Sequence, residues 1–177
     1  NILIVYMILF TLFNALSIVA PDYNTLLMSR FLAGLPHGAF FGVGTIVAIK
    51  LSKKGKEAQA VSSMFTGLTL AILLLVPFLT YIGHNTSYKW AFLIVSLLGI
   101  FTILALIKFM PKLKSLKTVT FKEEIEFFLT FKAWHIILIV AIGFGGLFAW
   151  FSYIAPLLIN VSKFPPSSIS YLMLVAG

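Results

Sequence analysis

Two side chains deep inside the apolar stretches of this sequence could carry a charge or a proton, Arg30 and His37. An arginine at the centre of a membrane helix costs about 2.5 to 3.5 kcal/mol on insertion scales, so Arg30 requires a reason to be there. Histidine has an unperturbed pKa of about 6.5 and can exchange a proton near physiological pH, although a neutral packing histidine is the commoner case. The simpler alternative for Arg30 is an anchor near the outer interface, whose long side chain reaches the headgroups.

The residues after Arg30 favour a helix face that looks into the protein. Gly34, Gly38 and Gly42 follow at intervals of four residues, and small residues at that spacing let a second helix approach closely. Pro36 is expected to bend the same helix. An inward Arg30 needs an acid or a polar ligand. Because the apolar spans contain no Asp or Glu, a carboxylate partner in the membrane would have to lie on another helix of the same protein.

Hydroxyl and aromatic side chains are candidates for a solute path. A stripe of hydroxyls shares one helix face and comprises Ser62, Thr66, Thr69 and Thr80. Interhelical hydrogen bonding explains this stripe as well as a solute path does. Trp150 and Tyr153 lie among phenylalanines later in the chain. Tyr153 is a better candidate for lining a cavity than the phenylalanines, because its hydroxyl needs a partner.

No grouping of residues in this sequence resembles a catalytic or metal site. Cysteine is absent, which excludes disulfides, zinc ribbons and thiol catalysis from this stretch. His84 and His135 lie near opposite membrane faces without clustered acids. The glycines within 143–146 follow no strand, so they do not form a nucleotide loop. We therefore expect neither an enzyme nor a bound cofactor.

The elements that hold these residues have the composition of membrane spans. The chain has 177 residues, of which 60% are hydrophobic and 10% charged, whereas soluble domains carry about 25% charged residues. A helix needs about 20 apolar residues to cross the bilayer. Five apolar runs and the start of a sixth at 167–177 fit this pattern, and the five cover residues 1–20, 26–49, 58–82, 90–109 and 133–159. The expected fold class is an all-α, polytopic transmembrane helical bundle.

The lysines support this number of spans. Two connections on one side of the membrane hold four and six basic residues, and two on the other side hold one each. Lys and Arg are retained on the cytoplasmic side, so the first span runs from the cytoplasm to the outside. The net charge of +8 then follows from lysines near anionic lipid headgroups, and nucleic-acid binding is not needed to explain it.

The long connection at 111–132 is the candidate linker between two bundles. Thr120 and Glu123 have the spacing of a capping box, which predicts a short amphipathic helix at the cytoplasmic surface. The alternative is that these residues simply begin the next span. Because the chain opens at Asn1 inside one apolar run and stops within another, we expect further helices of the same protein to complete it.

The segment RFLAGLPHGAFFG, from Arg30 to Gly42, is similar to the fourth helix of transporters of the major facilitator superfamily. It resembles in particular the bacterial drug:proton antiporter branch that is often labelled arabinose-efflux-permease-like. The similarity continues in register over nearly the whole chain, at Gly67-Leu68-Thr69, Pro77, Trp90-Ala91-Phe92, Gly145-Gly146-Leu147-Phe148 and Tyr153-Ile154-Ala155-Pro156.

The resemblance implies a domain division and a place in the family's fold. The chain would run from the third helix of the family to the beginning of the eighth. Residues 1–110 would be the last four helices of the N-terminal six-helix half, 111–132 the cytoplasmic central loop, and 133–177 the start of the C-terminal half.

The resemblance also implies roles for individual residues. It assigns proton coupling to Arg30 and helix packing or gating to Pro77 and the glycines, including Gly67. The antiporter motif of the fifth helix is matched only in part, because Leu75 and Leu79 stand where the family usually has glycines. This departure leaves strict antiport coupling open.

The expected function is proton-coupled efflux of a small solute, a drug, sugar or nucleoside, across a bacterial inner membrane by alternating access. Arg30 is the expected coupling residue, with His37 as a helper. The expected solute path includes Tyr153, Trp150, Thr66 and Thr69. The alternatives are an uncoupled facilitator or sugar permease of the same fold, a membrane receptor or structural subunit, and a membrane enzyme.

Overall fold

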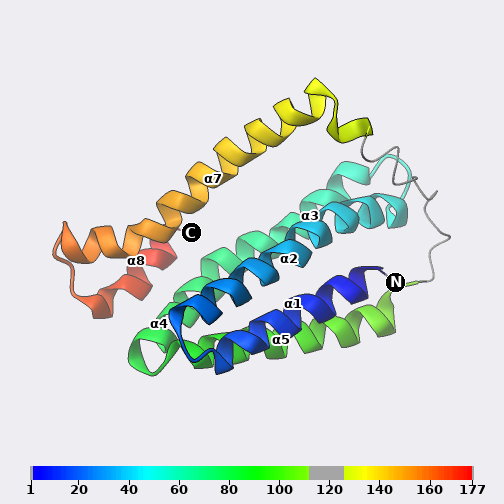
Figure 1. Ribbon diagram of the computed structural model, residues 1–177. Coiled ribbons are helices and arrows are strands. Elements are labelled where there is room, and N and C mark those ends of the chain that lie inside the picture. The colour runs from blue at the N-terminus through cyan, green and yellow to red at the C-terminus, as the bar shows by residue number, and fades with distance from the viewer. Residues whose placement is uncertain (1, 112–125, 177) are drawn as a thin grey trace. The chain divides into compact units, whose positions relative to one another are not determined.

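The computed structural model describes residues 2–111 and 126–176, and every element in these ranges is a helix. The capping box expected at Thr120 and Glu123 lies outside the described residues. The elements are α1 (Ile2–Val19), α2 (Tyr23–Leu51), α3 (Glu57–Leu70), η1 (Ala71–Leu75), α4 (Val76–Asn85), α5 (Tyr88–Phe109), α7 (Phe131–Asn160), η2 (Pro166–Ser168) and α8 (Ile169–Ala176) (Figure 1).

Four of the described helices are long and apolar enough to cross a membrane: α2, the continuous α3–η1–α4, α5 and α7. Helix α1 has 18 residues, which at 1.5 Å per residue gives about 27 Å, close to the hydrocarbon thickness of about 30 Å. Large apolar side chains face outward, and Phe101 and Phe131 are 70% and 79% exposed. Such exposure suits lipid rather than water, so the expected all-α membrane fold is confirmed.

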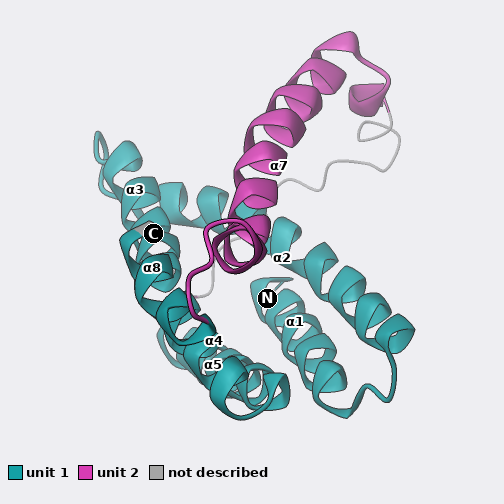
Figure 2. Cartoon of the chain, turned by 90° about the vertical axis from the view of Figure 1, so that its left-hand side faces the viewer, with its two compact units in different colours: residues 1–110, 166–177 teal, residues 111–165 magenta. Residues whose placement is uncertain are grey.

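The chain divides into two units, residues 1–110 with 166–177, and residues 111–165 (Figure 2). In the first unit, α1 packs against both α2 and α5, α2 packs against α3, and α4 packs against α5 and α8. The second unit contains α7, which begins where the Thr130 side chain accepts a hydrogen bond from the Ala133 N–H. The expected division into 1–110, 111–132 and 133–177 stays a prediction.

The turn between α1 and α2 is closed by an acidic cap. The Asp22 carboxylate accepts a hydrogen bond from the Thr25 N–H at 2.8 Å and another from the Thr25 hydroxyl at 3.2 Å. These bonds satisfy a free donor of the first helical turn. The Thr25 N–H bond also holds the pKa of Asp22 below its ordinary value.

The long third span contains a π-helical turn that the sequence patterns did not predict. In η1 the Val76 N–H donates to the Ala71 carbonyl oxygen, five residues earlier. Pro77 follows at once and is buried. Because proline lacks an N–H and its ring clashes with the carbonyl four residues before it, a wider turn is a local way to accommodate it. Helix α8 packs beside α4 and η1 at this turn.

Candidate functional site

The buried face of α1 is polar although the helix is apolar overall. Its buried residues include Thr11, Asn14 and Ser17, at intervals of three residues. Each side chain donates a hydrogen bond to a carbonyl of the preceding turn, and for Asn14 the acceptor is the Phe10 oxygen at 2.7 Å. These bonds leave the Asn14 Oδ1 and Ser17 Oγ atoms able to accept hydrogen bonds from α2.

Arg30 of α2 donates hydrogen bonds to those acceptors. Its Nη1 donates to Asn14 Oδ1 at 3.0 Å, and its Nη2 donates to the Phe13 carbonyl oxygen at 3.2 Å and to Ser17 Oγ. On the α5 side, the guanidinium carbon lies 4.3 Å from the centroid of the Phe92 ring, within the range of a cation–π interaction. The side chain therefore points between α1 and α5, and the alternative of a snorkelling anchor does not describe it.

The Ser29 hydroxyl extends this cluster behind Ser17. Ser17 Oγ lies 2.7 Å from Ser29 Oγ, and Ser29 donates to the Leu26 carbonyl oxygen at 2.7 Å. The Ser17 hydroxyl has one proton, which it donates either to the Phe13 carbonyl oxygen or to Ser29 Oγ, and in both arrangements Ser17 Oγ can accept from Arg30. Both serines are buried, so this acceptor is held in place beside Arg30.

All the partners of Arg30 in the described residues are electrically neutral. The described acids of this unit are Asp22, which caps α2, and Glu57, which accepts from the Gly55 N–H. The Arg30 Nε is buried and has no hydrogen-bond partner in the described part of the chain. Neutral acceptors solvate the guanidinium but leave its positive charge uncompensated, which is costly in a low-dielectric setting.

The position of Phe92 depends on a close approach between α1 and α5. Ser96 and Gly99 are the buried residues of α5. A Cβ added at Gly99 would overlap the Thr11 hydroxyl oxygen and lie 3.2 Å from the Thr11 Cβ. Glycine is therefore required for this spacing, which brings the Phe92 ring over Arg30.

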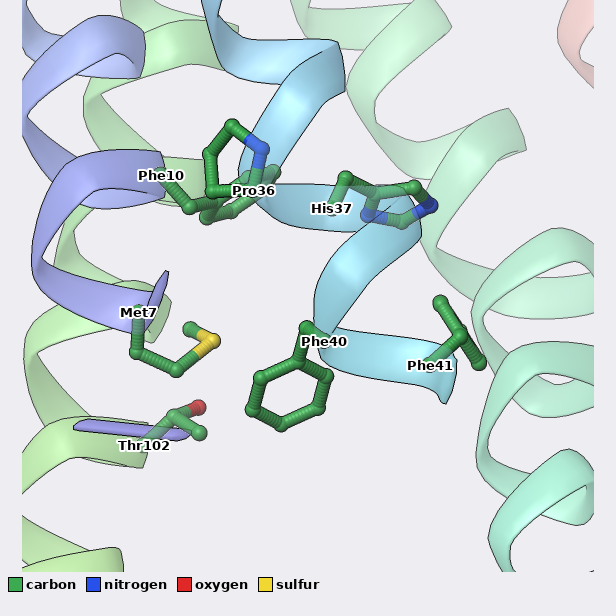
Figure 3. A pocket seen from close by; sticks show the side chains of 7 residues that line it. All are labelled: Met7, Phe10, Pro36, His37, Phe40, Phe41 and Thr102. Carbon is green, nitrogen blue, oxygen red and sulfur yellow. The ribbon is translucent and has the colours of Figure 1, made fainter. Parts of the chain in front are cut away.

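Seven residues after Arg30 on the same helix, His37 lies in a different setting. Its ring stacks on Phe10 with centroids 5.9 Å apart and meets the edge of Phe41 at 5.0 Å. Beside it is a pocket of about 240 Å³, lined by side chains that converge from α1, α2 and α5 in Figure 3: Met7, Phe10, Pro36, His37, Phe40, Phe41 and Thr102. The pocket is apolar and aromatic, with His37 and Thr102 as its polar residues.

The whole chain, residues 1–177, matches the Major Facilitator Superfamily. The chain belongs to this superfamily. It is 36% identical over 175 residues to the inner membrane transport protein YdhP of Escherichia coli K12. It is 32% identical over 177 residues to AraJ of the same strain, which is named a transporter, and 30% over 178 residues to the MFS-type transporter YtbD of Bacillus subtilis.

The matches cover 99% to 100% of this chain and 45% of each of these relatives. The chain therefore spans a little under half the length of the curated proteins that it matches. The superfamily is one of membrane transporters rather than enzymes. The expected multi-pass location in an inner membrane is confirmed by the spanning helices and by the first of these relatives.

The glycines at 34, 38 and 42 of α2 do not pack closely against another helix among the described residues. Apart from the chain neighbours and the nearby backbone of the same helix, no described atom comes within 4 Å of a Cβ built at Gly34, Gly38 or Gly42, and the same holds for Gly67. The buried residues of α2 are instead Ser29, Ala33, Pro36 and Gly44. Close packing on these three glycines thus stays a prediction about other helices of the superfamily fold.

The remaining expected site residues are spread over both units. Thr66 and Thr69 lie exposed on α3 and donate to carbonyls of their own helix at 3.0 and 3.2 Å. Pro77 is buried next to η1. Trp150 and Tyr153 lie on α7, 52% and 68% exposed, and belong to the other unit. The structure thus brings Arg30 together with α1 and α5, and His37 with the aromatic pocket.

The sequence patterns did not identify the partners of Arg30. These partners are Phe13, Asn14, Ser17 and Phe92, and Ser29 lies behind Ser17. One signal was available, because Thr11, Asn14 and Ser17 recur every three residues within an apolar run, as polar residues that face a neighbouring helix do. The expected need for an acid or polar ligand is met here by neutral groups.

Proposed function

We propose that this chain belongs to a proton-coupled efflux transporter that exports a small solute by alternating access. Membership of the superfamily supports transport across the membrane. The observation that carries the coupling is the Arg30 guanidinium, which is held by Asn14, Ser17 and Phe13 without a described counter-ion. The resemblance to the drug:proton antiporter branch supports the direction of transport.

The mechanism uses the uncompensated charge of Arg30. An ionised carboxylate elsewhere in the protein would be attracted to it by about 4 kcal/mol at 4 Å and an effective dielectric constant near 20. Protonation of that acid removes the attraction, so the equilibrium between two conformations changes when a proton binds. Coupling then requires that the solute and the proton favour opposite access states.

The other site residues have supporting roles in this proposal. His37 helps proton movement or presents its ring to the solute in the aromatic pocket. Tyr153, Trp150, Thr66 and Thr69 line the solute path. Gly34, Gly38, Gly42 and Gly67 allow close packing against further helices of the protein. Pro77 and the π turn before it form a point at which the third span changes shape.

The test uses the whole protein in sealed liposomes with a pH indicator in the lumen. Under an imposed proton gradient, three probes are added in turn: the aromatic cation ethidium, the sugar arabinose and the nucleoside inosine. We expect one of them to drive proton movement and Arg30→Ala to abolish it. Thr45→Val is the control, because among the described residues the Thr45 hydroxyl bonds only the Phe41 carbonyl of its own helix. Probe movement that ignores the gradient in the wild type would refute coupling.

One observation favours a second candidate, an uncoupled facilitator. Leu75 lies in η1 and Leu79 in α4, on either side of Pro77, where the related antiporters usually have glycines. Bulky residues here alter how closely another helix can approach the π turn. A facilitator would move the probe at a rate that the imposed pH gradient leaves unchanged.

A further inference from the structure

We propose that Asn14 is a positioning residue for Arg30, and that it acts because its amide holds the guanidinium without neutralising it. This inference rests on the proposed coupling role of Arg30. It assigns to α1 a part in the transport cycle beyond helix packing. Its test has a readout that stands even if the coupling role fails.

Both polar groups of the Asn14 amide form hydrogen bonds. The Nδ2 donates to the Phe10 carbonyl oxygen at 2.7 Å, and Oδ1 accepts from Arg30 Nη1 at 3.0 Å. The residue is only 2% exposed, so water does not compete for either bond. Turning the amide over would set its NH₂ group against the guanidinium donors and place Oδ1 against a carbonyl oxygen. The backbone of α1 thus fixes the direction in which Oδ1 accepts.

The neutrality of Asn14 matters as much as its geometry. An aspartate has nearly the same shape and would accept the Arg30 hydrogen bond at least as well, because charge-assisted bonds are stronger. It would also form an ion pair and cancel the charge that the proposed mechanism uses. An amide supports the guanidinium and leaves the positive charge available to an acid on another helix.

The groups that face the Arg30 guanidinium are not titratable in the described part of the chain. From α1 they are the Asn14 amide, the Ser17 hydroxyl and the Phe13 carbonyl, and from α5 the Phe92 ring. On α2 itself, Ser29 lies behind Ser17. An acid introduced at position 14 would therefore be the one titrating neighbour of Arg30 among these residues.

The experiment compares Asn14→Ala, Asn14→Asp and the control Asn85→Ala in the whole protein. Asn85 also donates its amide to a carbonyl of its own helix, that of Tyr81 at 2.8 Å, but is exposed. With the probes ethidium, arabinose and inosine, we expect Asn14→Ala to lose about tenfold or more of gradient-driven transport, because it removes a hydrogen bond to a charged group. We expect Asn14→Asp to lose transport as well, because its carboxylate cancels the charge of Arg30. Asn85→Ala keeps the wild-type rate.

The Tm of the purified protein, measured against pH, is the second readout. We expect the Tm of Asn14→Asp, relative to that of the wild type, to fall as the pH is lowered, because protonation of the new carboxylate removes its attraction to Arg30. We expect this fall to disappear when Asn14→Asp is combined with Arg30→Gln. A merely structural Asn14 predicts instead that Asn14→Asp transports like the wild type. That result, or wild-type transport by Asn14→Ala, would overturn the inference.

The two proposals fail in different ways. If Arg30→Ala transports normally under the gradient, the coupling role fails, while the dependence of the Asn14→Asp Tm on Arg30 still reports the contact. If Arg30→Ala is inactive but Asn14→Ala is normal, only the positioning role fails. If none of the three probes moves, the Tm comparison with Arg30→Gln decides the contact by itself, and an unchanged Tm profile would overturn it.

Discussion

Arg30 and His37 lie seven residues apart on α2, and their polar side chains are accommodated in the membrane span by different contacts. Arg30 is held by the hydrogen bonds that it donates to acceptors on α1 and by the Phe92 ring. His37 lies among aromatic rings beside an apolar pocket. The first setting fixes one charge in one place, whereas the second offers a surface to a flat or apolar group. In our proposal, the first site couples protons to transport and the second contacts the solute.

The largest stability effect is expected where the Arg30 site depends on helix spacing. Gly99→Ala would force α5 away from Thr11 of α1 and move Phe92 away from Arg30. Overpacking of this kind costs about 1 to 3 kcal/mol, so we expect a clearly lower Tm and a loss of transport. Gly83→Ala on α4 is the matched control, because no described atom lies within 4 Å of its added Cβ. Equal Tm values for the two variants would contradict the inference that the Arg30 site depends on the spacing between α1 and α5.

A smaller and more selective effect is expected at His37. His37→Phe keeps a ring that can stack on Phe10 and meet Phe41, so the Tm should stay close to that of the wild type. We expect the affinity for the transported probe to change while proton movement is retained, which a KM and kcat comparison in liposomes would measure. Loss of proton movement to the extent seen in Arg30→Ala would show that the two sites share one role.

The smallest effect is expected at the turn that joins α1 to α2. The Thr25 N–H bond lowers the pKa of Asp22, so the contribution of this cap to stability is present above the ordinary aspartate pKa of about 3.9. It is lost as the pH falls through the lowered value. Asp22→Asn keeps an acceptor and should remove that pH dependence from the Tm. A Tm profile identical to that of the wild type below pH 4 would contradict the cap.

Most of the fold could be predicted from the sequence because lipid leaves the backbone few choices. Every N–H and C=O in the hydrocarbon must be satisfied within its own segment, so the apolar runs at 26–49 and 90–109 correspond to α2 and α5. The π turn at Ala71–Leu75 could not be predicted, because it depends on how the chain relaxes around Pro77.

The candidate site was predictable in part. Arg30 stands out as the one charge away from the ends of an apolar span, and its need for a polar partner follows from desolvation. Which partner it finds depends on the register of α1 against α2, and single-sequence periodicity does not give that register. For the same reason the glycine stripe at 34, 38 and 42 indicated a packing face, whereas the close approach in the described residues is at Gly99.

The most direct test of the central claim is proton movement in liposomes that contain the wild type, Arg30→Ala or Arg30→Lys. The claim is that an uncompensated guanidinium couples protons to solute export. It predicts solute-driven proton movement in the wild type, none in Arg30→Ala, and a reduced rate in Arg30→Lys, because an ammonium keeps the charge but not the bonds to Asn14 and Ser17 together. Undiminished proton movement in Arg30→Ala would contradict it.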